Sequence, residues 1–514
     1  DLGRIDNARD VSEALILERL GRRGFPQKVE EAAEQAAASP IEAARQDLTG
    51  LPTFTVDPAT ARDFDDAVSA RREGDGLRLW IHIADVSAFV RPGSILEKEA
   101  FLRANSTYVP TSVEPMLPHS LSSGVCSLSP GDERLAVTSE MLLSGSGEVT
   151  SASFYRSRIR SDARLDYDQL DQIFAGRESA PEIVAEQLDL ARKAAAILAE
   201  LRKGNALEVN SAEPSFEFDD EGNVTRAVAE RATEAHRLIE QLMVLTNEQV
   251  AGLTVNRGIP SVYRVHEMPD PDRVERMLAQ LASLELPAPP VPSGMGPSTA
   301  GQLAVEASRS VAKEAARRGH GATAYSSLVL RSLKPARYLE KNLGHAGLGS
   351  EAYCHFTSPI RRFPDLLVHR ALLSAVGGGE EAPSTGDAAE AALHASERER
   401  EAMILERDAD DICAAFLLER ELFQEGYEKR FEGEVSGVIR SGAFVRFNGR
   451  LGDVYEGFVP ARRIRGERFE LNEEETSLVG SKTGRKVSLG DAIAVQVEKV
   501  DAPRGRVDLD PADG

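Results

Sequence analysis

The chain has 514 residues, which is enough for more than one domain with a large hydrophobic core. Hydrophobic residues make up 41% and charged residues 28%, as in ordinary globular proteins, and no apolar run reaches the ~20 residues that a membrane helix needs. The net charge of −22 argues against duplex DNA as a partner, although arginines do gather locally at Arg361-Arg362 and Arg462-Arg463. We therefore expect neither a membrane nor duplex DNA among the partners.

The cysteines are few, odd in number and far apart, at Cys126, Cys354 and Cys413. This spacing indicates neither a disulfide framework nor a zinc site, and it is typical of a reducing compartment. We therefore expect the protein in the cytoplasm.

Residues 1–45 are predicted to form an N-terminal helical domain. Apolar residues recur at helical spacing over 11–20, glycines and a proline interrupt the pattern at 21–26, and a Glu/Ala-rich helix follows over 29–38. Two short helices around a glycine-containing turn are typical of a DNA-reading helix-turn-helix and equally of a plain helical hairpin. The sequence leaves both interpretations open.

Four carboxylates crowd a short stretch between apolar segments: Asp57, Asp63, Asp65 and Asp66. Like charges held this close repel one another, so a fold that buries them requires protonation or a cation among them. Oxygen ligands favour a hard ion, Mg²⁺ with Mn²⁺ as the alternative, and thereby phosphate chemistry. A bend is needed to bring Asp57 and Asp66 to the same ion.

Two simpler interpretations of this acidic stretch remain. It is also typical of a solvated turn, although Phe64 and the following Ala67-Val68 pair indicate partial burial. A calcium loop is disfavoured, because the sixth and twelfth positions from Asp63 are Val68 and Gly74 rather than Gly and Glu.

Helices and strands alternate from residue 46 to 426, which predicts a mixed α+β domain. Strands are expected over 79–87, 135–143 and 149–159, and helices over 186–201, 232–253, 305–318, 366–375 and 388–426. The proline-rich stretch 287–297 and the glycine-rich stretch 377–386 are predicted loops.

A second constellation lies within this domain at residues 353–365. Thr357-Ser358 before Pro359 predicts the start of a helix, whose free N–H groups can bind phosphate. Arg361 and Arg362 add two guanidinium groups, which bind phosphate through paired hydrogen bonds. Taken alone, the stretch is equally typical of an exposed basic turn.

Residues 427–514 change to an alternating, glycine-punctuated pattern. Strands beginning at Phe431 and continuing over 455–460, 486–490 and 492–500 predict a five-stranded barrel of OB type. Such barrels bind single strands through aromatic side chains on an open face, and Phe444 and Phe458 are the candidates. The alternative for each is a place inside the barrel.

Taken in chain order, these stretches resemble one family. The matching motifs are residues 57–66, 82–87, 108–110, 116–118, 121–128, 263–267 and 355–362. Together they look like the RNB catalytic domain of the ribonuclease II family, over residues 50 to about 375, and the final barrel resembles the S1 domain that follows it there. The expected fold is therefore α+β, with an RNB domain between N-terminal helices and a C-terminal S1 barrel.

The resemblance implies a function and roles for particular residues. Members of the family are Mg²⁺-dependent 3′→5′ exoribonucleases that hydrolyse single-stranded RNA from a free 3′ end and release nucleoside 5′-monophosphates. A monomer is expected. The implied site comprises metal ligands Asp57, Asp63, Asp65 and Asp66, catalytic residues Asp65, Arg361 and Glu240, and RNA-binding residues Tyr108, Arg362, Phe444 and Phe458.

The sequence also departs from the family pattern. About 45 helical residues take the place of the family's cold-shock RNA-binding domains, and the region 207–209 lacks the second aromatic that helps clamp the RNA end in some relatives. Two alternative functions follow: a catalytically inactive RNA-binding relative, and a DNA-binding regulator that acts through the N-terminal helices.

Overall fold

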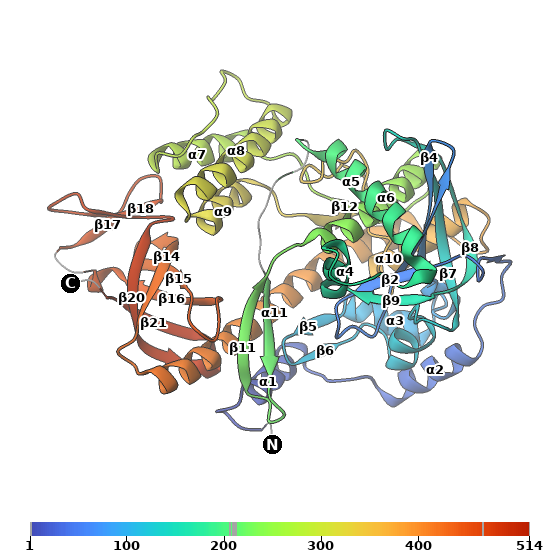
Figure 1. Cartoon of the computed structure of the whole chain (residues 1–514), viewed down its shortest axis with the longest axis horizontal. Helices are drawn as coiled ribbons and strands as arrows, with labels where there is room; N and C mark the ends of the chain where they lie inside the picture. Colours follow the sequence, from blue (N-terminus) through green and yellow to red (C-terminus); the bar gives the residue numbers. More distant parts are fainter. Residues whose placement is uncertain (1–2, 205–206, 208–212, 465–466, 513–514) are drawn as a thin grey trace.

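The fold combines a large mixed α/β body with a β-barrel at the opposite end of the molecule (Figure 1). We describe a computed structural model that covers residues 3–204, 207, 213–464 and 467–512. The expected α+β class is confirmed, because helices and strands both contribute extensively. None of the helices in these residue ranges has the length and apolarity to cross a membrane.

A seven-stranded sheet with the order β1-β8-β7-β4-β3-β2-β9 forms the centre of the body. Its strands are β1 (Gln46–Asp47), β2 (Phe54–Asp57), β3 (Asp66–Glu73), β4 (Gly76–Ala84), β7 (Glu133–Leu143), β8 (Val149–Arg160) and β9 (Ala163–Asp166). The strand expected over 79–87 ends at Ala84, where the chain turns into a short 3-10 helix, Val86–Ala88. The other two predicted strands match β7 and β8.

Helices pack on this sheet and share its hydrophobic core. Helix α5 (Ala185–Arg202) lies on β3 and β4, α6 (Glu234–Arg257) packs against α5, and α10 (Phe363–Ala375) packs against α6. Smaller elements complete the body around the sheet: α3 (Ile95–Arg103), β5 (Thr107–Val109), β6 (Ser112–Glu114), α4 (Tyr167–Phe174), β12 (Tyr263–Val265) and β13 (Arg337–Leu339). The predicted helices 186–201, 232–253 and 366–375 match three of these elements.

The two N-terminal helices pack mainly on other elements. Helix α1 (Ala8–Leu20) lies along the long helix α11, whereas α2 (Gln27–Ala38) lies on α3 and on the short π-helix Ser120–Val125. Their buried apolar residues belong to cores built mostly by later segments. A DNA-reading helix-turn-helix presents its second helix freely, and this packing does not provide one.

Helix α11 (Thr385–Glu425) connects the body to the barrel (Figure 1). It begins with a capping box, in which Ser384 and Asp387 exchange side chain-to-backbone hydrogen bonds. Its 41 residues span roughly 60 Å at the helical rise of about 1.5 Å per residue. The same helix therefore borders α1, the hairpin β10–β11 (Glu213–Phe218 and Val224–Glu230) and the barrel.

The C-terminal strands form a closed barrel, in which β14 (Arg430–Ile439), β15 (Gly442–Phe447), β16 (Tyr455–Pro460), β21 (Arg506–Pro511) and β20 (Ala492–Asp501) follow one another. The prediction that residues 486–490 form a strand of the barrel was wrong. Residues Lys486–Ser488 form β19, which pairs with β18 (Ser477–Gly480) in a separate sheet that also contains β17 (Phe469–Leu471). The fifth barrel strand is β21 instead. Alternation of apolar and polar residues identifies a strand, but it does not show which other strand it pairs with.

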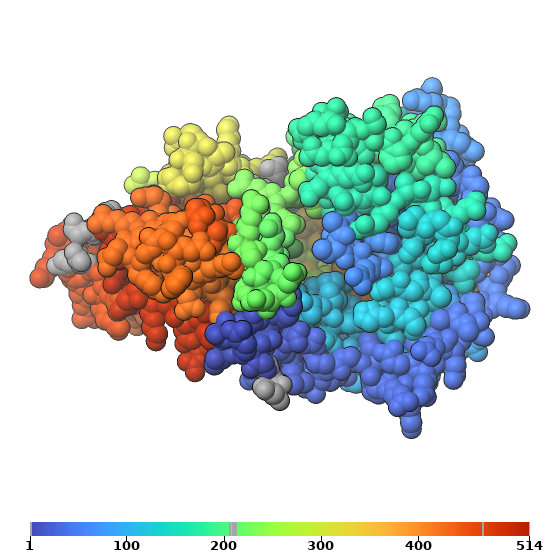
Figure 2. Space-filling view, turned by 60° about the horizontal axis from the view of Figure 1, so that its bottom comes forward, coloured from blue at the N-terminus to red at the C-terminus, as the bar shows by residue number. Residues whose placement is uncertain are grey.

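Three further helices share one core with the barrel and the end of α11: α7 (Pro271–Ser283), α8 (Pro297–Arg318) and α9 (Ala322–Ser332). The hairpin β10–β11 also contacts this half, because the Ala227 amide donates to the Leu451 carbonyl and the Ala229 amide to Asp453. Figure 2 shows the green segment that contains the hairpin between the blue N-terminal region and the orange barrel. The barrel is thus held to the body by several segments.

We expect Glu421→Ala to lower the free energy of unfolding by about 3 kcal/mol. The Glu421 carboxylate is fully buried, where it accepts hydrogen bonds from the Arg450 and Leu451 amides and the Tyr455 hydroxyl and pairs with Lys429. Removing it leaves buried donors without a partner. Urea unfolding checks this, with the exposed Glu419→Ala as control; equal stability of the two variants would contradict it.

Candidate active site

A pocket of about 580 Å³ opens at one edge of the central sheet. It brings together residues that lie far apart in the chain. Its lining includes Asp57, Asp63, Asp65, Asp66, Tyr108, Glu240, Arg361 and Arg362, which are eight of the ten predicted site residues. Phe444 and Phe458 lie elsewhere, on the barrel.

The four carboxylates converge because the chain bends between two neighbouring strands. Asp57 ends β2 and Asp66 begins β3, so both lie at the same edge of the sheet. Between them the loop is anchored by Phe64, whose amide donates to the Ser127 hydroxyl and whose carbonyl accepts from the Leu128 amide. The bend that the sequence required is present.

Burial raises the pKa of three of these carboxyl groups, those of Asp57, Asp65 and Asp66. For Asp57, burial and then the charges of Asp66, Asp65 and Asp63 raise the pKa to about 8. Burial raises the pKa of Asp66 to about 7, against the opposing effect of Arg361, and raises the pKa of Asp65 well above its usual value. A cation at this place would stabilise the ionised forms.

The donor set fits a hard cation. The Oδ2 atoms of Asp57 and Asp65 are buried without a hydrogen-bond partner. Within the described ranges, no group of three or more His, Cys, Asp or Glu side chains is arranged so that the side chains alone could hold a metal ion. Mg²⁺ is usually held by one or two carboxylates together with water and substrate phosphate, so an all-protein cage is not needed.

Arg361 faces the carboxylates. Its Nε lies 3.5 Å from Asp65 Oδ2, and its Nη2 donates to the Ser358 hydroxyl at 3.0 Å. The side chain is 43% exposed, so the guanidinium lies at the open side of the pocket. This position allows it to pair with an incoming anion.

Arg362 has a more buried environment. Its Nη2 donates to Asp365 Oδ1 at 2.8 Å, and its backbone pairs with Asn105. The Asp365 carboxylate is fully buried and also accepts from the Ser358 amide, so it holds the loop before α10. Arg362 therefore anchors this loop.

The helix expected to start at Thr357-Ser358-Pro359 begins later. Helix α10 starts at Phe363, with Pro364 in its first turn. The two preceding amides that could have capped an anion are already engaged, because Ser358 donates to Asp365 and Ile360 donates to Asp65. These contacts with distant carboxylates hold the loop in a turn and explain the wrong prediction.

Tyr108 lies in β5 and faces the pocket with a side chain that is 39% exposed overall. Its hydroxyl donates to Asp63 Oδ2 at 3.4 Å, and its amide donates to Glu406 of α11 at 2.8 Å. Burial of the hydroxyl end and the charge of Asp63 raise the pKa of Tyr108, so it stays neutral. The side chain is thus held beside the carboxylates and remains partly exposed to the pocket.

Helix α6 supplies one wall of the pocket. Glu240 is exposed there, and Asn247 lies two turns further on the same face. The Asn247 amide donates to the Tyr353 hydroxyl at 3.0 Å and its oxygen accepts from the Phe356 amide at 2.9 Å. Asn247 therefore ties the loop that carries Arg361 to the helix that carries Glu240.

Tyr167 is a pocket residue that the sequence did not reveal. It follows Asp166, whose strand β9 pairs with β2 beside Asp57. Its ring stacks on His236 with centroids 3.9 Å apart. Burial and then the charges of Asp66 and Asp57 raise its pKa. A lone tyrosine after a short strand carries no recognisable signal, and only the strand pairing places it here.

Phe444 and Phe458 face each other across β15 and β16, with ring centroids 5.1 Å apart. Both are half-buried, whereas Phe447 is buried in the barrel. Gly437 and Gly442 lie against the two rings, where a Cβ atom would come within 3.3 Å and 2.6 Å of them. The pair therefore lies at the barrel surface, away from the pocket.

Comparisons with known proteins agree with the two-part organisation. Residues 45–378 match the RNB domain and residues 426–510 match the S1 RNA binding domain. Ribonuclease R 1 of Lactococcus lactis is 34% identical over 527 residues, which cover 98% of this chain and 61% of the relative. Ribonuclease R of Escherichia coli is 34% identical over 508 residues, covering 94% of this chain and 60% of the relative.

A solved structure is also similar. The apo form of Mycoplasma genitalium RNase R superimposes with a TM-score of 0.87 at 27% identity, covering 99% of this chain and 79% of that one. The same enzyme has been solved with ribose-methylated single-stranded RNA and with double-stranded RNA. Residues 208 and 209, where the second clamp aromatic is missing, lie outside the described residues.

The family assignment follows from the extent of these matches. The RNB match covers more than half of the chain, and the chain spans about 60% of the length of the first curated relatives that it matches. The motifs at 57–66 and 355–362 meet in one pocket within the matched region. The chain therefore belongs to the ribonuclease II/R family of RNB-domain exoribonucleases, with an S1 domain after the RNB domain.

Proposed function

We propose that the protein is a Mg²⁺-dependent 3′→5′ exoribonuclease that hydrolyses single-stranded RNA to nucleoside 5′-monophosphates. One observation carries the proposal. Four clustered carboxylates share a pocket with a half-exposed arginine and a hydrogen-bonded tyrosine, and burial together with the neighbouring charges raises the pKa of Asp57 to about 8. Phosphodiester hydrolysis needs this combination of a cation site, an anion-binding group and a platform that positions the substrate.

RNA is the partner that the relatives support. The similar Mycoplasma genitalium enzyme binds ribose-methylated single-stranded RNA, and this chain carries an S1 match of its own. The surface pair Phe444 and Phe458 offers stacking surface of the kind that OB-type barrels use for single strands. We extend these features to an RNA substrate with a free 3′ end.

Tyr108 would position the terminal nucleotide. Two hydrogen bonds hold this residue in place, one from its hydroxyl to Asp63 and one from its backbone amide to Glu406. A base stacked on this ring holds the next phosphate near the carboxylates. Tyr167 on the side of Asp57 and Asp66, and Glu240 on α6, would border the same nucleotide.

Arg361 would bind the scissile phosphate. In the substrate-free structure its guanidinium pairs with Asp65 from a half-exposed position. A phosphate at the mouth of the pocket offers stronger, paired hydrogen bonds, and the guanidinium stabilises the negative charge that builds on the phosphoryl oxygens. Asp365 and Asn247 hold the loop on which this arginine lies.

The carboxylates of Asp57, Asp63, Asp65 and Asp66 would hold Mg²⁺, with Mn²⁺ as the alternative ion. When bound, the ion supplies an activated water and neutralises charge on the phosphate. The residues themselves hold the site in place, since Asp65 accepts a hydrogen bond from the Ile360 amide and the buried Phe64 side chain anchors the loop next to it. We further propose a monomer that acts in the cytoplasm.

The alternative functions receive less support. An inactive relative would be expected to have lost part of the catalytic set, yet Asp57, Asp63, Asp65, Asp66 and Arg361 all lie in one pocket. A DNA-binding regulator would need a free recognition helix, and α1 and α2 both pack along the body.

Digestion of a 3′-tailed RNA duplex in the presence of Mg²⁺ tests the proposal. We expect mononucleotides to be released from the single-stranded tail, with a stall near the duplex or passage through it. Chelation of the ion should stop the reaction. Endonucleolytic fragments, or full activity without a divalent ion, would contradict the assignment.

Asp65→Asn should reduce cleavage at least about 1,000-fold while RNA binding survives. The amide can still accept from the Ile360 amide, so the loop is kept, but the negative charge beside Arg361 is lost. Cleavage rates and fluorescence-polarisation binding measure the two effects. Asp75→Asn, at an exposed turn, is the matched control; full activity of Asp65→Asn would refute the mechanism.

Tyr108→Ala should raise the KM for short oligoribonucleotides by about tenfold, because one base–aromatic stack contributes roughly 1–3 kcal/mol. Tyr108→Phe keeps the ring and loses only the hydroxyl that bonds Asp63. Steady-state kinetics on a tetranucleotide compare the KM of the Tyr108→Ala and Tyr108→Phe variants. If Tyr108→Phe is impaired as strongly as Tyr108→Ala, the hydroxyl rather than stacking carries the effect.

A further inference from the structure

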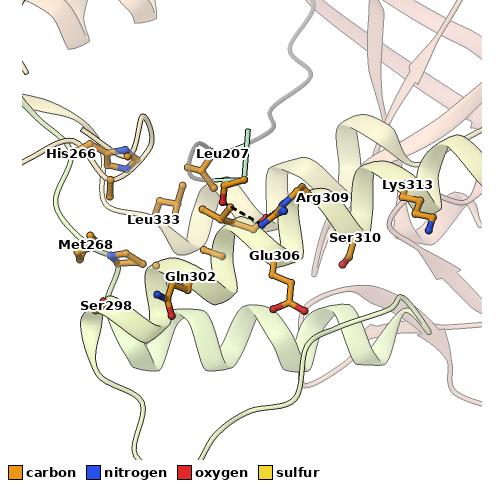
Figure 3. Close-up of a pocket in the computed structure, with 17 residues that line it drawn as sticks. Leu207, His266, Met268, Ser298, Gln302, Glu306, Arg309, Ser310, Lys313 and Leu333 are labelled. Carbon is orange, nitrogen blue, oxygen red and sulfur yellow. Dashed lines mark hydrogen bonds between the residues drawn. The ribbon is translucent and has the colours of Figure 1, made fainter. Parts of the chain in front are cut away.

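A second pocket of about 720 Å³, whose lining includes none of the four carboxylates, lies between α8 and the segment around His266 (Figure 3). One side is the polar face of α8. The other is formed by the chain at His266, Met268 and Pro269 and by Leu333 at the end of α9. None of the ten predicted site residues lines it, and we refer to this pocket as the α8 groove.

The polar side chains of the groove follow one face of α8. Gln302, Glu306, Arg309 and Lys313 are three or four residues apart, so successive turns of the helix present them in a row. In Figure 3 Arg309 points toward Leu207, and Lys313 lies further along the helix. The Arg309 guanidinium is held over the groove by hydrogen bonds to the Val305 and Gly204 carbonyls.

These two cations are not neutralised by carboxylates. Within the described ranges neither Arg309 nor Lys313 forms an ion pair, whereas Arg317 and Arg318 on the same helix both pair with Glu314. Glu306 is the one acidic side chain that lines the groove among the described residues, so its lining carries a surplus of positive charge. In a chain of net charge −22, such a surplus is a local feature that favours an anion.

The groove also has apolar surface. Met268, Pro269, Val305 and Leu333 contribute to it, beside the ring of His266. Burial lowers the pKa of His266, so this ring is neutral near pH 7 and does not add charge. Cationic side chains along one edge and apolar surface along the other match the backbone and bases of a single strand.

The α8 groove lies close to the catalytic pocket. His266 packs edge-on against His345 and His345 against Tyr353, both with ring centroids 5.2 Å apart, and Tyr353 lines the catalytic pocket. Leu207 lines the groove and Glu213 lines the catalytic pocket, and the six residues of chain from one to the other can span at most about 20 Å. The two pockets are therefore close enough for one RNA strand to reach from one to the other.

We propose that the α8 groove binds the backbone of single-stranded RNA upstream of the 3′ end that occupies the catalytic pocket, with Arg309 and Lys313 as its phosphate contacts. The inference rests on the proposed function, because it takes RNA as the substrate. Contacts of this kind do not depend on base identity. They add affinity for long substrates and none for oligonucleotides that fill only the catalytic pocket.

The double variant Arg309→Ala/Lys313→Ala tests the groove. Both side chains are exposed and alanine favours helix, so α8 is retained. In an Asp65→Asn background, we expect the dissociation constant for a 20-nucleotide RNA to rise about tenfold. The slope of log affinity against log salt should fall by about 1.4, since each phosphate contact on a single strand contributes about 0.7.

The matched control is Lys28→Ala/Arg72→Ala, which removes two exposed positive charges from α2 and β3. It should leave affinity and salt slope unchanged. In the otherwise unmodified chain, Arg309→Ala/Lys313→Ala should cleave a tetranucleotide with unchanged kcat/KM and lose efficiency only as the substrate lengthens.

Two results would overturn the inference. One is wild-type affinity of Arg309→Ala/Lys313→Ala for the 20-nucleotide RNA. The other is weakened binding of a free nucleoside monophosphate with unchanged binding of the long RNA, which would make the groove a nucleotide site. Failure of the unmodified chain to cleave any RNA would instead refute the proposed function, while the binding comparison would still decide the role of the groove.

Discussion

The structure around the active site depends on holding four like charges together in a buried place. Asp57 and Asp66 end and begin neighbouring strands, so the sheet itself forces them to one edge. Asp65 is kept beside them by the Ile360 amide and by Arg361, which come from a loop almost 300 residues later. The loop that contacts Asp65 therefore also places Arg361, the arginine that we propose to bind the phosphate, at the mouth of the pocket.

The need to hold these carboxylates together is also reflected in the hydrogen bonds that fix the segments around the pocket. Two hydrogen bonds hold the loop before α10: the Ser358 amide donates to Asp365 and the Phe356 amide donates to Asn247 of α6. The backbone that carries Arg361 is therefore held in place, while its side chain extends to the open side of the pocket. Tyr108 is held in turn by Glu406 of α11, the helix that reaches the barrel. Helix α11 therefore connects the pocket, through Tyr108, with the S1 barrel.

Much of the fold and of the site could be predicted where the signal is local. Helical periodicity located α5, α6 and α10 to within a few residues, because one buried stripe specifies a helix without reference to its neighbours. The acidic stretch and the paired arginines were recognised by residue type, and the structure brings Asp57 through Asp66, Tyr108, Glu240 and Arg361 into one pocket. The strand at Lys486–Ser488 was assigned to the wrong sheet, since alternation identifies a strand but not the strand beside it.

By itself the sequence determined which chemical groups are present: clustered carboxylates, for which we propose a cation, adjacent arginines, for which we propose phosphate contacts, and a C-terminal barrel pattern. Only the tertiary structure decided which side chains meet. Tyr167 and Asn247 enter the catalytic pocket through strand pairing and helix packing, and Arg362 turns toward Asp365 rather than outward. The structure also shows that Glu314 pairs with Arg317 and Arg318, whereas Arg309 and Lys313 form no ion pair within the described residues. The physical reason is that charge, burial and hydrogen bonding depend on distances between residues that the chain order leaves unspecified.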